Sequence, residues 1–351
     1  MPTHSDNADM LTRRIAVTGA TGMLGGHLVA ELIRTGHTDI TLVVRDAGRT
    51  ALTMSAIERL GITVPDGVLR TVETQLTDPT ALTDALPDID TVFNCAARIM
   101  SGSMTPAQLI DNNVAIARSV TEWCLRCGVR KLIHVSSISA LGEPPSPEEP
   151  ITEECEPAHI ETHAAYGRSK YYSEREIWRG ASSGLEVVVV SPGVILGEGA
   201  KGGNNSAALI PAISCGQPFY TLGLMSYVDV RDVARAMVML DSRPEAVGQK
   251  FILSAGDLSY KELIGMGAHA AHRPAPFIRI GRTAVNAAYA GMRLLIALRL
   301  MKDRGVTREN LGSVLRTVHY DGSKITRMFG FRYTPLSETV TRVVQACRRR
   351  T

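Results

Sequence analysis

The chain has 351 residues, of which 44% are hydrophobic, so it is long enough for one large domain or two interleaved domains with a substantial core. Its net charge of +3 comes without a dense basic face, which does not favour a nucleic-acid binder. Residues 1–10 are polar and acidic and lack the regions of a signal peptide, so we expect a disordered leader and no export. Six cysteines without a dense framework favour a reducing cytoplasm.

A stretch rich in glycine near the N-terminus predicts a phosphate-binding turn. Residues 15–18 are typical of a buried strand, and three leucines then recur at helical spacing: Leu24, Leu28 and Leu32. Between strand and helix lie Gly19, Gly22 and Gly25. Glycine here allows a tight turn, a close approach to a phosphate and close packing of helix on sheet. With 31 glycines in the chain this spacing also arises by chance, and it differs from the G-x-G-x-x-G pattern.

The second strand ends in a residue that indicates the cofactor. Gly36 ends the first helix, residues 40–44 predict a strand, and Arg45 follows directly. At this place in a dinucleotide fold an acid would bind the ribose 2′-hydroxyl, whereas arginine accommodates a 2′-phosphate. The sequence therefore favours NADP(H) over NAD(H), with Arg49 as a helper. A solvated loop arginine is the alternative.

The strands that follow alternate with helices. A helix and loop cover 46–68, strands are predicted at 69–72, 91–95, 131–135 and 186–190, and helices at 106–127 and 166–183. This alternation predicts an α/β fold with a Rossmann-type doubly wound parallel sheet. Its ligand should lie at the carboxyl ends of the strands.

The alternation breaks after residue 197. We expect a dinucleotide-binding domain at 11–197 that also receives 226–256, and a smaller, mostly helical substrate-binding cap made of 198–225 and 257–351. A short helix is predicted at about 199–216, and residues 227–234 predict a strand and helix that return to the sheet. Residues 250–254 predict one more strand.

One segment of the cap, 283–301, is strongly apolar. Arg293 and Arg299 interrupt it, so it is too short to span a membrane, which requires about 20 apolar residues. A core or pocket helix is the favoured interpretation, and binding to a membrane surface the less favoured one.

Tyr166 and Lys170 lie four residues apart at the start of a predicted helix, so both side chains can reach one pocket. Tyr320 and Lys324 repeat the spacing, but the intervening Asp-Gly pair favours a turn that would separate them. A tyrosine that exchanges protons near neutral pH needs a nearby cation to favour the phenolate.

The positions of the histidines do not indicate a metal site. His159 and His163 are four residues apart, but no third ligand has suitable spacing, so a loop role is favoured. His134 lies within a predicted strand, where a structural role in the core is the favoured interpretation.

Four motifs occur in order along the chain: Thr18-Gly-Ala-Thr-Gly-Met-Leu-Gly25, Val135-Ser-Ser137, Tyr166-x-x-x-Lys170 and Ser191-Pro-Gly-Val-Ile-Leu-Gly197. This set resembles the extended short-chain dehydrogenase/reductases over about residues 12–345. Within them it is most similar to the NAD-dependent epimerase/dehydratase branch that includes dihydroflavonol 4-reductase-like and 3β-hydroxysteroid dehydrogenase-like proteins.

The resemblance implies a role for particular residues. Tyr166 would be the general acid/base, Lys170 its activator and ribose ligand, and Ser137 the hydroxyl that orients the substrate oxygen. Residues expected to bind the cofactor are Gly19, Thr21, Gly22, Met23, Leu24, Gly25, Arg45, Gln75, Leu76, Ala96, Ala97, Pro192, Gly193, Val194 and Ile195. The chain departs from the family at Gln75, where many members have Asp, and at Ser191, where Arg is common.

The leading interpretation is an NADP(H)-dependent oxidoreductase that transfers a hydride between nicotinamide and a carbonyl or secondary alcohol of a small or medium apolar metabolite. An NAD-dependent nucleotide-sugar epimerase or dehydratase is the alternative, and a catalytically silent nucleotide sensor is a third. The resemblance also implies a homodimer, whereas a nucleic-acid or membrane partner is not expected.

Overall fold

The structure is a computed structural model that describes residues 11–100, 104–146, 148–198, 213–297 and 315–348. The expected leader and most of the helix predicted at 199–216 lie outside these residues. A seven-stranded parallel sheet has the order β10-β6-β5-β4-β1-β2-β3. Its strands are β1 (Arg14–Thr18), β2 (Asp39–Val44), β3 (Leu69–Glu73), β4 (Thr91–Asn94), β5 (Lys131–Val135), β6 (Glu186–Pro192) and β10 (Gln249–Leu253). The strand order reverses between β1 and β4, so a crevice opens at their carboxyl ends.

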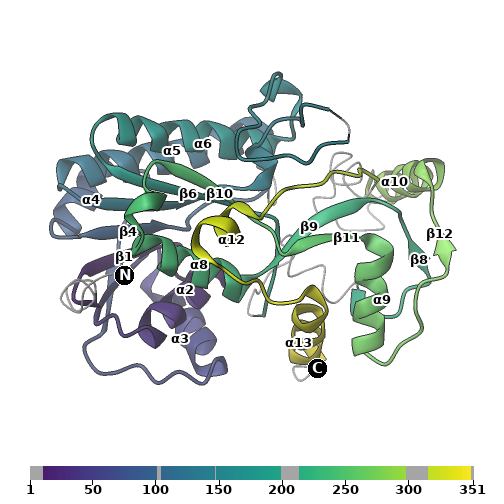
Figure 1. The fold of residues 1–351 in the computed structure, drawn as a ribbon, viewed down its shortest axis with the longest axis horizontal. Coiled ribbons are helices and arrows are strands. Elements are labelled where there is room, and N and C mark those ends of the chain that lie inside the picture. Colours follow the sequence, from purple (N-terminus) through teal and green to yellow (C-terminus); the bar gives the residue numbers. More distant parts are fainter. Residues whose placement is uncertain (1–10, 101–103, 147, 199–212, 298–314, 349–351) are drawn as a thin grey trace.

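Helices cover both faces of this sheet (Figure 1). One layer holds α2 (Met23–Arg34), α3 (Thr50–Arg59) and α8 (Val230–Asp241). The other holds α4 (Pro79–Ala85), α5 (Pro106–Arg126) and α6 (Ala165–Ser182). Short 3-10 helices are η1 (Ala47–Arg49), η2 (Ile138–Ala140), η3 (Ile160–Thr162) and η4 (Pro244–Ala246). This is the doubly wound α/β architecture expected from the sequence.

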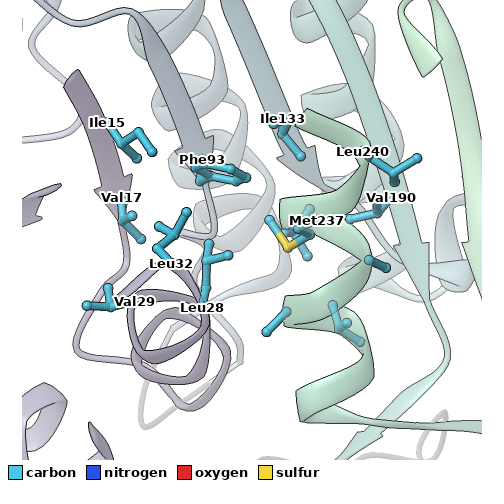
Figure 2. Packing of buried hydrophobic residues seen from close by; sticks show 14 of the residues in the cluster. Ile15, Val17, Leu28, Val29, Leu32, Phe93, Ile133, Val190, Met237 and Leu240 are labelled. Carbon is cyan, nitrogen blue, oxygen red and sulfur yellow. The ribbon is translucent and has the colours of Figure 1, made fainter. Parts of the chain in front are cut away.

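Two hydrophobic cores follow from the alternation of side chains along the strands. Ile15 and Val17 on β1 pack toward α2, where they join Leu28, as Figure 2 shows. Ala16, between them, belongs to the core under α5 on the opposite face. Burying one such aliphatic side chain fully contributes about 1.5–3 kcal/mol, so both faces of the sheet stabilise the position of the strand ends.

The C-terminal cap contains more strand than expected. β7 (Val194–Leu196), β9 (Leu224–Asp229) and β11 (Gly256–Ser259) form a second sheet of three strands, and β8 (Phe219–Tyr220) pairs with β12 (Ile278–Arg279). The prediction that the strand near 227 returns to the main sheet is wrong, because β10 occupies the free edge of β6 and β9 pairs with β7 instead. The helices of the cap are α9 (Tyr260–Ala270), α10 (Arg282–Ala297), α12 (Lys324–Phe329) and α13 (Leu336–Arg348).

Helix α10 is not a core helix, so that part of the expectation for 283–301 is wrong for the residues the structure describes, which end at 297 in this segment. Among its residues with described side chains only Val285 is buried, and Leu295 is 42% exposed. Five of its 16 residues are alanine, whose side chains bury little apolar area when they pack. No helix in the described ranges is both long and apolar enough to cross a membrane.

Candidate active site

The glycine turn between β1 and α2 has the geometry of a phosphate-binding loop. Gly19 has a φ of +68°, and a Cβ there would lie 2.9 Å from the Ala96 nitrogen. A Cβ on Gly25 would lie 2.2 Å from the Gly19 carbonyl oxygen, so both positions require glycine. Gly22 caps α2 without any side-chain hydrogen bond, which leaves the N–H groups of the first turn for a ligand.

A cavity of about 290 Å³ opens beside this turn, at the carboxyl ends of β1, β2 and β4. Eight of the residues expected to bind the cofactor line it: Gly19, Thr21, Gly22, Arg45, Gln75, Leu76, Ala96 and Ala97. The helper Arg49 lines it as well. Six further residues that were not predicted also line it: Val43, Thr77, Cys95, Arg98, Asn112 and Ile116. Three of these, Thr77, Cys95 and Arg98, directly adjoin an expected residue, so the strand ends predicted the place but not the full set.

Three arginines give this cavity its charge. Within the described part of the chain the guanidinium groups of Arg45, Arg49 and Arg98 form no ion pair, and the lining contains no Asp or Glu. Burial lowers the pKa of Arg45, and the charges of Arg98 and then Arg49 lower it further. Adjacent cations without a counterion favour an anionic ligand. The cavity therefore fits a nucleotide that carries several phosphate charges.

The remaining residues expected to bind the cofactor lie outside this cavity. Met23, Leu24 and Gly25 belong to α2, where Gly25 packs against the turn. Residues 192–195 run from the end of β6 into β7. A Cβ on Gly193 would lie 2.6 Å from the Ser226 carbonyl oxygen, so this glycine allows close passage against β9.

Ser137, Tyr166 and Lys170 come together at the end of β5 and the start of α6. Burial raises the pKa of Tyr166 to about 12, although a side-chain hydrogen bond with Ser137 acts in the opposite direction. Lys170 Nζ donates to the Val135 carbonyl at 2.8 Å. Burial lowers the pKa of Lys170 to about 8. Tyr166 is thus protonated near neutral pH and can donate a proton, whereas the expected stabilisation of its phenolate by Lys170 is not among the causes of its pKa shift.

A buried asparagine that the sequence analysis did not select joins this group to the cavity. Asn113 Oδ1 accepts from the Arg98 N–H at 2.7 Å, and its Nδ2 donates to the Arg98 carbonyl at 3.0 Å. The same Nδ2 donates to Ser169 Oγ at 3.0 Å, and Ser169 in turn donates to the Tyr166 carbonyl. A polar residue on the inward face of a predicted helix was the available signal.

The secondary candidates behave as structural residues. His134 is buried, and its Nδ1 lies 3.1 Å from Asn94 Nδ2, as expected for a core histidine. His163 faces Glu143 at 3.4 Å. Lys324 begins α12 and donates to the Lys250 carbonyl, so the turn after Tyr320 separates the second Tyr-Lys pair as expected.

Comparison with known proteins agrees with this geometry. The model of the NAD dependent epimerase/dehydratase family matches residues 15–256. The chain is 32% identical over 181 residues to sterol demethylase protein B of Methylococcus capsulatus, covering 52% of this chain and 51% of that protein. It is 28% identical over 261 residues to cinnamoyl-CoA reductase 1 of Petunia hybrida, covering 70% and 74%.

The fold is shared with solved structures. The crystal structure of gox2253 superposes with a TM-score of 0.77 at 24% identity, covering 97% of this chain and 99% of the other. The family match, which spans more than half of the chain, agrees with the parallel sheet and the glycine turn. The chain therefore belongs to the NAD dependent epimerase/dehydratase family and is an NAD(P)-dependent oxidoreductase of the extended short-chain dehydrogenase/reductase type.

Proposed function

We propose that this enzyme uses NADP(H) to reduce a carbonyl group on a small or medium apolar metabolite. The observation that carries the proposal is the placement of Ser137, Tyr166 and Lys170 next to a cavity with three unpaired arginines and no carboxylate. Ser137, Tyr166 and Lys170 are residue types that can exchange a proton with a substrate oxygen atom. The arginines of the cavity supply the positive charge that a phosphorylated nucleotide requires.

The cavity residues fit the adenosine half of the dinucleotide. The uncapped start of α2 and the glycine turn would hold the pyrophosphate. Arg45 and Arg49, at the end of β2, would hold a 2′-phosphate, with Arg98 facing them from the loop after β4. Three cations for one additional phosphate support NADP(H) over NAD(H).

The chemistry assigns one task to each of three side chains. When bound, the dinucleotide supplies the hydride. Tyr166, protonated near neutral pH, would donate its proton to the substrate oxygen. Ser137, hydrogen-bonded to the phenol, would donate to the same oxygen and stabilise its developing charge. Lys170, held by the Val135 carbonyl, would bind the ribose of the cofactor.

Exposed apolar side chains in the cap and the names of two relatives support the proposed substrate class. The cap exposes large apolar side chains, including Phe219 on β8 at 46% exposure and Phe277, directly before β12, at 74%. One relative is named as a cinnamoyl-CoA reductase and another as a sterol demethylase protein. A sterol and the cinnamoyl group in these names are apolar carbon skeletons, which supports a substrate with an apolar portion for this chain.

Steady-state kinetics tests the proposal. Purified protein is mixed with NADPH or NADH and a panel of ketones and aldehydes of increasing apolar size, and loss of the reduced cofactor is followed by absorbance. We expect net oxidation of NADPH at a higher kcat/KM than of NADH. Copurification of tightly held NAD, with no net turnover of any carbonyl, would instead indicate an epimerase or dehydratase.

We further propose that the chain forms a homodimer through α5 and α6. Their outer faces carry a groove whose lining includes Ile110, Val114 and Tyr172 together with charged residues of both signs. A surface with both signs can pair with a second copy of itself across a two-fold axis. Light scattering after size exclusion should give twice the chain mass, and Val114→Glu should give the single mass. A monomeric wild type would overturn this proposal.

A further inference from the structure

Glu174 is a buried carboxylate for which the proposed reaction has no use. It lies on α6, one turn after Lys170, and is 4% exposed. Its oxygens accept from three donors: Ser136 Oγ at 2.7 Å, Trp178 Nε1 at 3.1 Å and Lys250 Nζ at 2.5 Å. A buried carboxylate is costly unless it is paired and hydrogen-bonded, and this one is both. The arrangement points to a defined task for the charge.

The Ser136 contact reaches the proposed catalytic group directly. Ser136 lies between Val135, whose carbonyl accepts from Lys170 Nζ, and Ser137, whose hydroxyl is bonded to Tyr166. Its own N–H donates to the Val190 carbonyl on β6 at 2.8 Å. The hydrogen bond from Ser136 to Glu174 therefore fixes the segment Val135–Ser137 to α6. This segment carries the carbonyl that accepts from Lys170 and the hydroxyl that bonds Tyr166.

The same carboxylate faces the Lys170 ammonium as a charge. Burial lowers the pKa of Lys170, while Cys95 and Glu174 act to raise it. Burial raises the pKa of the Cys95 thiol to about 12, so this group is neutral near pH 7. His134 also faces Lys170, and burial holds its pKa well below the usual value. Among the described groups that face Lys170, Glu174 thus supplies the negative charge near neutral pH.

Lys250 is the ion-pair partner of the buried Glu174. It reaches across from β10, and its side chain is 13% exposed. Its second acidic neighbour, Glu156, is 4.0 Å away and 69% exposed, so that contact is weak. This ion pair joins α6 to β10, the edge strand of the sheet.

We propose that Glu174 is a positioning residue for the proposed reaction: it fixes the Val135–Ser137 turn against α6 and, four residues after Lys170 on the same helix, places a carboxylate on the side of that ammonium. This inference rests on the proposed function for its catalytic meaning. Its physical content, the ionisation state of Lys170, can be measured in the absence of any substrate.

The test is a titration of Lys170 in the full-length protein. The chain has only seven lysines, so ¹³C-labelled lysine gives few side-chain signals, and Lys170→Arg identifies the one that belongs to Lys170. In Glu174→Gln the pKa of Lys170 should fall by about one unit or more, because a facing carboxylate is lost while burial persists. The alkaline limb of kcat/KM for carbonyl reduction should move to lower pH by a similar amount.

Two further variants keep the result interpretable. Glu174→Gln leaves the Lys250 ammonium without its partner, and this unpaired cation itself lowers the pKa of Lys170. Glu174→Gln combined with Lys250→Met removes both charges, so in this stably folded variant the pKa of Lys170 should fall in the same direction but by less than in the single variant. Glu153→Gln is the matched control, since Glu153 is also buried but bonds the Ile252 N–H and does not face Lys170. It should leave the Lys170 titration unchanged.

An unchanged pKa of Lys170 in both Glu174 variants would overturn the inference. A Glu153→Gln variant that displaced Lys170 equally would overturn it too, because the effect would then come from general loosening of the core. If the wild type turned over no carbonyl, the proposed function would fail, whereas a displaced Lys170 titration would still uphold the charge assigned to Glu174.

Discussion

Replacing Arg45 by glutamine should separate the two nicotinamide cofactors. Arg45 lies at the end of β2 and, with Arg49 and Arg98, forms a group of cations without carboxylates in the cavity. A hydrogen bond to a charged group contributes about 1.5–3 kcal/mol. A tenfold change in Kd corresponds to about 1.4 kcal/mol, so Kd for NADPH should rise about 10- to 100-fold.

NADH has no 2′-phosphate, so its Kd should change by less than about threefold in the same variant. Isothermal titration with both cofactors, and with 2′-phospho-ADP and ADP, measures the difference directly. Arg98→Gln should show the same preference if Arg98 faces that phosphate. Arg70→Gln is the control, because Arg70 on β3 is 57% exposed and pairs with Asp39, the first residue of β2, at the opposite end of the strand. Equal weakening of NADPH and NADH by Arg45→Gln would refute the assignment of the arginines to the 2′-phosphate.

Two further predictions concern the frame of the site. In Gly25→Ala the new Cβ would meet the Gly19 carbonyl oxygen, so the variant should bind no dinucleotide in a titration. Its free energy of unfolding in urea should be lower by about 1–3 kcal/mol. Dinucleotide binding at wild-type affinity would contradict this. Burial alone would raise the pKa of Glu198, but Arg342 and Arg231 lower it to about 2. Ionised Glu198 therefore contributes about 3 kcal/mol to the free energy of unfolding at pH values above its unfolded-state pKa, near 4.5. This contribution is lost as the pH falls toward its folded-state pKa of about 2. Urea unfolding at pH 6 and pH 3 should show a smaller loss in Glu198→Gln than in the wild type, and equal losses would contradict the assignment.

The main sheet could be predicted because its strands are short apolar runs with alternating contacts. Residues 15–18 face α2 and α5 in turn, and the following glycines permit one turn geometry. These signals are local in the sequence. The Tyr166–Lys170 pair was predictable for the same reason, since four residues on a helix fix the relative direction of two side chains.

Features that depend on distant parts of the chain were not predictable. The pairing of β9 with β7 depends on which strand occupies the edge of β6, and no local pattern encodes that choice. Arg98 joins Arg45 only because β4 lies beside β1, and Glu174 meets Lys250 across residues far apart in the sequence. The exposure of α10 could not be predicted, because an apolar composition does not show whether another element packs against the helix.

The central claim is that Tyr166 transfers a proton during net carbonyl reduction by NADPH. The direct measurement compares the wild type with Tyr166→Phe for NADPH oxidation in the presence of the best carbonyl of the panel, with NADPH affinity measured in parallel. A general acid contributes about 100- to 10,000-fold to rate, so kcat should fall by at least about 100-fold while Kd for NADPH stays within about threefold. A Tyr166→Phe variant that oxidises NADPH at the wild-type rate would contradict the account.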